Sequence, residues 1–199
     1  MSDEYAELRL FPLQTVLFPR GRLGLRIFER RYTDLVTHCL RADQPFGICL
    51  IAAGNEVGEH ATPETVGTAV RIIDWNQRHD GLLGITVEGE RRFEIVQRRT
   101  PAGQAQEATV RWLPQPPTTR LPSALTPLAD LLERILNQLD GVYSELPRDL
   151  ADADWVSARL AELLPLPNEA RQQLLEIDSA EERLALIREA LDSEPSPRR

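Results

Sequence analysis

The chain has 199 residues, of which 42% are hydrophobic and 27% are charged, a composition typical of an ordinary globular protein. Its formal net charge of −8 disfavours non-specific nucleic-acid binding, which needs Lys and Arg to neutralise phosphates, so we expect no DNA partner. All 23 basic residues are Arg, which excludes a Ser–Lys dyad, a phosphate-loop lysine and a lysine-bound pyridoxal cofactor from these residues.

Features that direct a protein out of the cytoplasm are not evident in the sequence. The first five residues include two acids, where a secretory signal would be basic and then apolar. No apolar run approaches the roughly 18 residues that a membrane span needs. The two cysteines, Cys39 and Cys49, are interpreted as small buried apolar residues, and the sequence leaves open whether they form a disulfide. We therefore expect a cytoplasmic protein without a membrane partner.

Residues 8 to about 113 are expected to form β-structure with one inserted helix. The helix is predicted over 29–42, where apolar residues recur at i, i+3, i+4, i+7 and i+8. Pro12 and Gly21 bracket a predicted loop, and Asp80-Gly81 predicts a tight hairpin turn. Runs of alternating or β-branched residues predict strands over 8–11, 23–28, 46–52, 66–75, 82–87, 92–96 and 109–113.

The remainder of the chain is expected to be helical and acidic. Four prolines between residues 114 and 122 predict a stiff connector. Helically spaced apolar residues then predict a long helix from Leu125 to Val142 and a second over 155–164. Asn168 is expected to cap a short helix, and Ser179 with Glu182 resembles a capping box that begins a last one.

These elements predict an α+β fold in two parts. A β-barrel or curled sheet with one inserted helix is expected over residues 1–115, and a helical bundle over 116–192. Residues 193–199 are expected to form a disordered tail.

Several short motifs in the first part resemble the opening of the Lon protease N-terminal, substrate-binding domain. They occur in the order and approximate spacing of that family: Phe11-Pro12-Leu13, Val16-Leu17-Phe18-Pro19, Ile27-Phe28-Glu29, Arg31-Tyr32, Phe46-Gly47-Ile48, Val66-Gly67-Thr68, Asp80-Gly81, Gly89 and Arg92-Phe93. The helical part continues the likeness with Leu163-Leu164-Pro165-Leu166, Arg171 to Glu176 and Arg183-Leu184. The resemblance covers about residues 7 to 190.

This resemblance implies a PUA-like β-barrel followed by helices, and a role in selecting unfolded or tagged polypeptides. We expect a stand-alone version of the domain, without the ATPase and the peptidase of full Lon proteases. Its expected function is that of a non-catalytic, ATP-independent polypeptide-binding or adaptor module. The expected partners are unfolded or extended polypeptide and a protease or chaperone.

Two positions depart from the family pattern. Pro19-Arg20-Gly21 stands where the family usually has Pro-Gly, and Leu23-Gly24-Leu25 stands where it often has Leu-Pro-Leu. The expected fold is unaffected, but the shape of the first loop and of a pocket there is left open.

The candidate binding residues lie in the first third of the chain. They are Phe11, Phe18, Pro19, Phe28, Arg31 and Tyr32. The aromatic rings, together with Phe46, could form a groove for apolar side chains or beside an exposed strand edge. The preferred interpretation for each ring taken singly is that it belongs to the core, where aromatics bury large areas. Phe18 and Pro19 are predicted to be the most exposed. Glu29, at the start of the predicted helix, is interpreted as structural, favoured there by the helix dipole and able to pair with Arg92 across the sheet.

We expect no catalytic residue, no metal site and no cofactor. His38 and Cys39 are adjacent on the predicted helix and diverge, and the remaining His and acidic residues show no paired ligand spacing. No Gly-x-Ser-x-Gly turn occurs. RNA binding and small-ligand binding, both suggested by the PUA-like similarity, stay open as alternatives, and the sequence does not indicate the oligomeric state.

Overall fold

The computed structural model describes residues 4–56, 61–115 and 117–193, and its contacts divide the chain into two compact units. Unit 1 comprises residues 1–115 and unit 2 residues 116–199.

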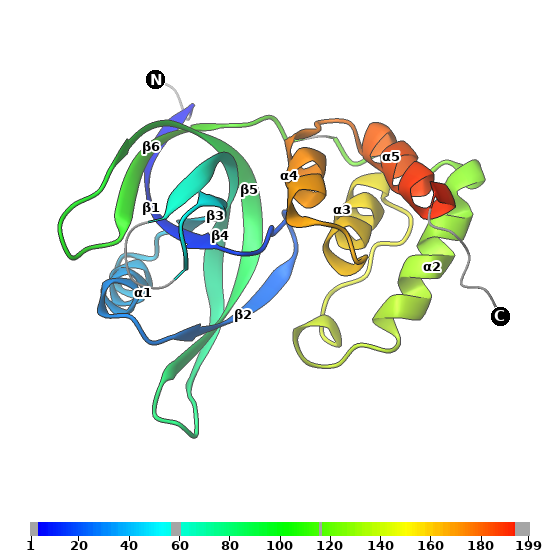
Figure 1. Ribbon diagram of the computed structural model, residues 1–199. Helices are drawn as coiled ribbons and strands as arrows, with labels where there is room; N and C mark the ends of the chain where they lie inside the picture. The colour runs from blue at the N-terminus through cyan, green and yellow to red at the C-terminus, as the bar shows by residue number, and fades with distance from the viewer. Residues whose placement is uncertain (1–3, 57–60, 116, 194–199) are drawn as a thin grey trace. The chain divides into compact units, whose positions relative to one another are not determined.

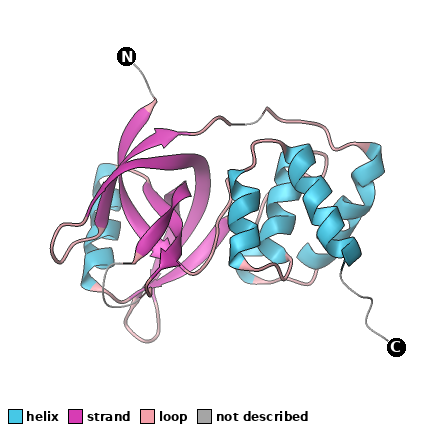
Figure 2. Ribbon diagram, turned by 45° about the horizontal axis from the view of Figure 1, so that its top comes forward, coloured by secondary structure: helices cyan, strands magenta, loops and turns pink. Residues whose placement is uncertain are grey.

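Unit 1 is a curled sheet with one helix packed against it (Figures 1 and 2). Its elements are β1 (Tyr5–Leu13), β2 (Arg22–Ile27), α1 (Arg30–Ala42), β3 (Phe46–Ala53), β4 (Thr62–Gln77), β5 (Leu83–Arg99) and β6 (Gln106–Trp112). The strand order is β2-β5-β4-β3-β1-β6, and β6 also pairs with β5. The second pairing bends the sheet into an incompletely closed ring, as expected for a barrel or curled sheet.

The long strand β5 pairs with two different strands, β2 and β6, along the same edge. Its first part, Leu83–Glu88, pairs with β2, and its second part, Phe93–Arg99, pairs with β6. We predicted two separate strands here, over 82–87 and 92–96, because these two runs are rich in β-branched and apolar residues. That prediction is wrong, because β5 is one continuous strand. Gly89 allows this continuity, since its lack of a Cβ lets the Phe18 backbone approach the strand closely. A Cβ at Gly89 would lie 2.4 Å from the Phe18 carbonyl oxygen.

The strand β1 extends two residues further than the sequence predicted. Pro12 was expected to begin a loop, yet β1 runs to Leu13. The pairing of β1 with β6 ends at Leu10, whereas its parallel pairing with β3 continues to Leu13. Pro12 therefore lies where β1 has lost its β6 neighbour, so the missing N–H need not disrupt a ladder there.

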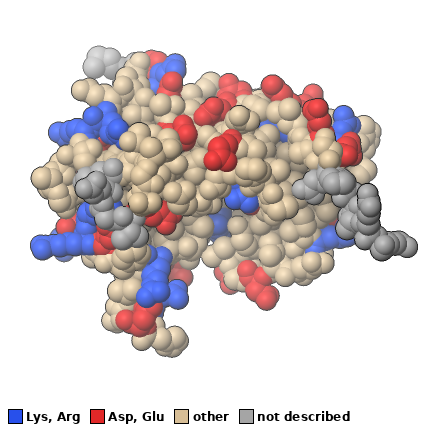
Figure 3. Space-filling view, viewed as in Figure 1, with Lys and Arg blue, Asp and Glu red and all other residues tan. Residues whose placement is uncertain are grey.

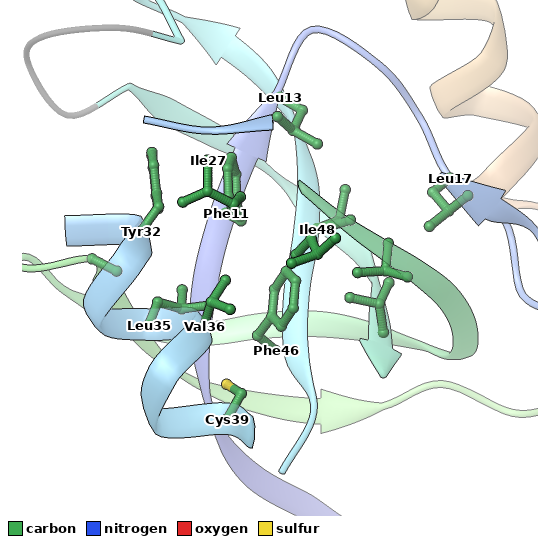
Figure 4. Packing of buried hydrophobic residues seen from close by; sticks show 14 residues of the cluster. Phe11, Leu13, Leu17, Ile27, Tyr32, Leu35, Val36, Cys39, Phe46 and Ile48 are labelled. Carbon is green, nitrogen blue, oxygen red and sulfur yellow. The ribbon is translucent and has the colours of Figure 1, made fainter. Parts of the chain in front are cut away.

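Successive residues of the strands point to two different cores. One core lies between the sheet and α1 (Figure 4) and consists of Phe11, Leu13, Leu17, Ile27, Tyr32, Leu35, Val36, Cys39, Phe46, Ile48, Val70, Ile85, Val87 and Ala105. The other consists of Leu8, Leu10, Cys49, Ala69, Phe93, Ala108 and Val110. Because alternate side chains on a strand face opposite ways, both faces of β1 and β3 are buried. The two cysteines are unpaired and lie in different cores.

Unit 2 is helical in its described part. Its elements are η1 (Ser123–Leu125), α2 (Thr126–Leu136), η2 (Gly141–Tyr143), α3 (Ala153–Leu163), α4 (Asn168–Glu176) and α5 (Ala180–Ser193). None of the helices in the described residues is both long and apolar enough to span a bilayer. The tail expected over 193–199 lies outside the described residues except for Ser193, which ends α5.

In unit 2 the helix predicted over 155–164 is confirmed as α3, whereas two other helix predictions are wrong. The expected long helix ends at Leu136 instead of Val142, and Gly141, with a left-handed φ of 70°, begins a separate 3-10 turn. Asn168 is the first residue of α4, and Pro167 is its N-cap. Ser179 Oγ does accept the Glu182 N–H at 3.2 Å, as the capping-box prediction requires.

Candidate functional site

The strand β2 provides an open edge of the sheet. It pairs with β5 on one side, and no other strand among the described residues pairs with it. Half of its backbone N–H and C=O groups therefore point away from the sheet, where an added strand can bind. Arg22, which lies on this edge, pairs with Glu88 on β5 at 2.8 Å, and Arg26 pairs with Asp80 at 3.1 Å.

A pocket of about 230 Å³ lies beside β2, between this strand, the end of β1 and the start of α1. Its lining residues are Phe11, Leu13, Thr15, Leu23, Gly24, Leu25, Arg26, Ile27, Phe28, Glu29, Tyr32 and Glu56. Most of these side chains are apolar or aromatic. Two further hollows on unit 1 are lined mainly by polar and charged residues, including the Glu107 carboxylate that pairs with Arg99 at 2.6 Å. The β2 pocket is therefore the better candidate for apolar recognition.

The aromatic wall of the β2 pocket is rigid. The Phe11 and Tyr32 rings are stacked, with centroids 3.9 Å apart and planes 10° apart. Figure 4 shows Tyr32 rising from α1 beside Phe11 and Ile27. The Arg31 guanidinium lies 4.7 Å from the Tyr32 ring centroid and adds a cation–π contact. Phe28, in contrast, is 56% exposed, so a ligand can cover it.

Arg31 is linked to two residues that line the pocket, Glu29 and Glu56, by an ion pair and a hydrogen bond. Arg31, which is buried, pairs with Glu29 Oε2 at 2.9 Å, and its Nη2 donates to the Glu56 carbonyl oxygen at 3.5 Å. The Gln14 backbone N–H donates to the Glu56 carboxylate. Glu29 is the N-cap residue of α1, so the ion pair lies where β2 passes into the helix. The predicted pairing of Glu29 with Arg92 is wrong, because Glu29 pairs with Arg31 and Arg92 donates to the Pro114 carbonyl oxygen at 3.1 Å.

The Tyr32 phenol remains protonated at neutral pH. Burial raises the pKa of Tyr32; the Arg31 charge lowers it in part, and the Glu29 and Glu56 carboxylates raise it further. Tyr32 therefore brings a neutral O–H group to the wall of a largely apolar pocket. This arrangement is suited to non-covalent recognition.

The structure brings together three of the six predicted binding residues, Phe11, Phe28 and Tyr32, as walls of the β2 pocket. Arg31 lies behind the wall, against Tyr32. The core interpretation and the groove interpretation are compatible for two of the rings, because Phe11 and Tyr32 are both buried and pocket-lining.

Phe18 and Pro19 lie elsewhere. Phe18 was predicted to be exposed, but its side chain is only 2% exposed. The loop that carries it is fastened to β5, because Arg20 donates to the Gly89 carbonyl oxygen at 2.7 Å and Gly89 donates to that of Gly21 at 2.8 Å. Pro19 is half-buried, and neither residue lines the β2 pocket.

Sequence reasoning missed Glu56 and did not name Leu23 and Leu25 as pocket residues. The alternation of Leu23 and Leu25 with Gly24 and Arg26 predicted the strand, and this pattern could also have suggested a half-exposed face. Glu56 lies in a loop after β3, and no sequence pattern connects it with α1. Among the described residues, no group of three or more His, Cys, Asp or Glu side chains is placed to hold a metal ion.

The comparisons with curated proteins, with solved structures and with a family model all indicate the same family. The chain is 24% identical over 198 residues to the Lon protease of Anaeromyxobacter dehalogenans and 23% identical over 192 residues to Lon protease 2 of Myxococcus xanthus. These matches cover 96% and 93% of this chain but only 24% and 23% of the relatives, so the chain spans about a quarter of their length.

Two solved structures match almost the whole chain. A Lon N-terminal domain protein from Xanthomonas campestris is 37% identical, with a TM-score of 0.77, and the match covers 96% of this chain and 99% of that one. The N-terminal domain of a Mycobacterium avium complex Lon protease is 16% identical, with a TM-score of 0.61 and coverages of 96% and 100%, and it shows the same fold. The family model described as the ATP-dependent protease La (LON) substrate-binding domain matches residues 7–193, and the chain therefore belongs to this family.

Proposed function

We propose that this chain is a polypeptide-binding module that holds extended, apolar segments at the free edge of β2. The observation that carries the proposal is the position of the β2 pocket directly beside that edge. A polypeptide added to β2 gains main-chain hydrogen bonds and places alternate side chains toward the pocket. The chain performs no covalent step in this proposal, and acts as an adaptor that presents the polypeptide to a protease or chaperone.

The size of the pocket supports a side chain as its occupant. Pockets that enclose a small-molecule ligand usually measure roughly 300–1,000 Å³. The β2 pocket, at about 230 Å³, is smaller and is open on the side of an exposed Phe28. One apolar side chain of a longer polypeptide fits this description better than a separate metabolite. Because an extended polypeptide loses entropy when it binds, we expect a dissociation constant on the order of micromolar.

The proposal is tested with a labelled polypeptide that is kept unfolded by reduction and carboxymethylation. Its binding is measured by fluorescence anisotropy, with the folded form of the same protein and a structured RNA as comparisons. We expect Phe28→Ala to raise the dissociation constant about five- to tenfold, because the variant removes an exposed aromatic wall of the pocket.

Tyr5→Ala is the matched control. Tyr5 is also exposed and aromatic, but it lies six residues before Phe11 on β1, about 20 Å along the strand. We expect this variant to bind within twofold of the unaltered chain. Equal binding of the unfolded and folded forms, or equal losses in the two variants, would overturn the proposal, as would stronger binding to the RNA.

A further inference from the structure

We propose that the β2 site selects polypeptides that carry a cationic side chain two positions from the apolar anchor, and that Glu56 makes this selection. The inference rests on the proposed function and adds the chemical class of the segment that is bound. It follows from the charges of the pocket, from their place along β2 and from the geometry of an added strand.

The charges around the pocket leave one carboxylate without a cationic partner. Arg26 is paired with Asp80 at 3.1 Å, and Glu29 is paired with Arg31 at 2.9 Å. The Glu56 carboxylate accepts the backbone N–H of Gln14, which carries no charge. In the parts of the chain that the structure describes, no Arg pairs with the Glu56 carboxylate. The pocket therefore presents a net negative charge to its occupant.

This negative charge lies at one end of the pocket. Arg31 donates to the Glu56 carbonyl oxygen and pairs with Glu29, which follows the last residues of β2. The Glu56 backbone is therefore near the start of α1, whereas Leu23, which also lines the pocket, lies near the start of β2. The effect of both carboxylates on the pKa of Tyr32 agrees with this placement.

An added strand has a fixed spacing that brings a second side chain to this end. Residues two positions apart on a strand point to the same face and are separated by about 7 Å, whereas a residue one position away points to the opposite face. When the anchor occupies the apolar part of the pocket, the next side chain on the same face lies toward Glu56. An Arg or Lys there meets a carboxylate, and an acidic residue meets a like charge.

The expected gain is modest because the Glu56 side chain is half-exposed. Ion pairs between partly exposed groups are weakened by water and by salt, so the preference corresponds to about two- to fivefold in affinity at low ionic strength. The preference should decline as salt is added, whereas the contribution of the apolar anchor should not.

The test uses synthetic peptides of one length and one apolar anchor, in which a single Arg lies two positions before, two positions after, or one position from the anchor. A neutral peptide and one with Glu in place of Arg complete the set. With the full chain, we expect one of the two peptides with Arg at the second position to bind two- to fivefold more tightly than the neutral peptide. The peptide with Arg at the first position should gain less, and the Glu peptide should bind more weakly.

The protein variants separate the local effect of Glu56 from the overall charge. Glu56→Gln retains an acceptor for the Gln14 N–H and should abolish the preference for the Arg peptide over the neutral peptide. Glu189→Gln makes the same change in charge at an exposed position on α5 and should preserve the preference.

The outcomes distinguish this inference from the proposed function. If every peptide, the neutral one included, fails to bind, the proposed function itself fails. If the neutral peptide binds but Arg gives no gain at either second position, the charge selection is overturned and the apolar site stands. An equal gain at the first and second positions, or its persistence in Glu56→Gln, likewise overturns the role of Glu56.

Discussion

Tyr32 shows how one residue can belong to the core and line a pocket at once. One side of its ring is stacked on Phe11 within the core, and its side chain also lines the β2 pocket. A ring held in this way loses little freedom when a ligand binds, which reduces the entropic cost of recognition. The aromatic residues that carry the resemblance therefore serve stability, and in our proposal they also serve binding.

Gly67 on β4 is required by the close packing of the core that contains Cys49 and Phe93. A Cβ there would lie 2.5 Å from the Ile48 carbonyl oxygen, 2.7 Å from Cys49 Sγ and 2.8 Å from the Phe93 ring. The carbonyl oxygen belongs to a paired strand and cannot easily move away. We predict that Gly67→Ala destabilises the protein by about 2–3 kcal/mol, measured by urea unfolding.

Gly103 is the matched control for this substitution. It has a φ of 71°, and no atom lies within 4 Å of the place of its Cβ. Gly103→Ala should therefore cost only about 1 kcal/mol, for the left-handed backbone alone. A similar free-energy change in both variants would contradict the packing explanation for Gly67.

At the scale of elements, local patterns predicted where strands and helices lie better than where they end. The helix α1 and the strand β2 agree with their predicted ranges to within one residue at each end, because their spacing of apolar residues is regular. The continuity of β5 and the early end of α2 were missed. In the first case a polar stretch resembles a turn unless its contact with Phe18 is known, and in the second the apolar pattern continues past the last helical residue into a separate 3-10 turn.

The aromatic residues of the candidate site could be predicted from the sequence, whereas the free edge of β2 and the place of Glu56 could not. Phe11, Phe28 and Tyr32 could be named from the sequence because they belong to recognisable motifs. The free edge of β2 depends on which strands pair at long range, and these pairings leave no local signal. Glu56 joins the pocket through contacts with Gln14 and Arg31, respectively 42 and 25 positions away in the sequence.

At the scale of the whole molecule, the charge distribution agrees with binding to polypeptide better than to nucleic acid. On the face shown in Figure 3, basic and acidic side chains are interspersed. Both the net charge of −8 and this mixture disfavour long-range attraction to phosphates.

The absence of lysine gives the chain a simple alkaline titration. Between about pH 8.5 and 11 its side chains that ordinarily titrate are cysteine and tyrosine, since Arg remains charged. Burial raises the pKa of Cys49 and of Cys39, and it also raises the pKa of Tyr32 and Tyr143. The folded state therefore retains protons that the unfolded state has lost.

This difference predicts the direction of the pH dependence. The stabilisation is fully present below the ordinary thiol and phenol pKa values and is lost as pH rises above them. We expect the free energy of unfolding, measured with urea under reducing conditions, to fall from about pH 9 and more steeply above pH 10. Tyr32→Phe should make the fall above pH 10 shallower. A constant free energy of unfolding from pH 8 to 10.5 would refute this prediction.

The central claim, that polypeptide adds to the free edge of β2, is tested most directly by amide hydrogen exchange with and without a saturating unfolded polypeptide. We predict slower exchange at the backbone amides of residues 22–28 in the complex, because the groups of β2 that face away from β5 gain partners. The amides of α5 should be unaffected. Unchanged exchange in β2 at saturation, with protection elsewhere in the chain, would contradict the account.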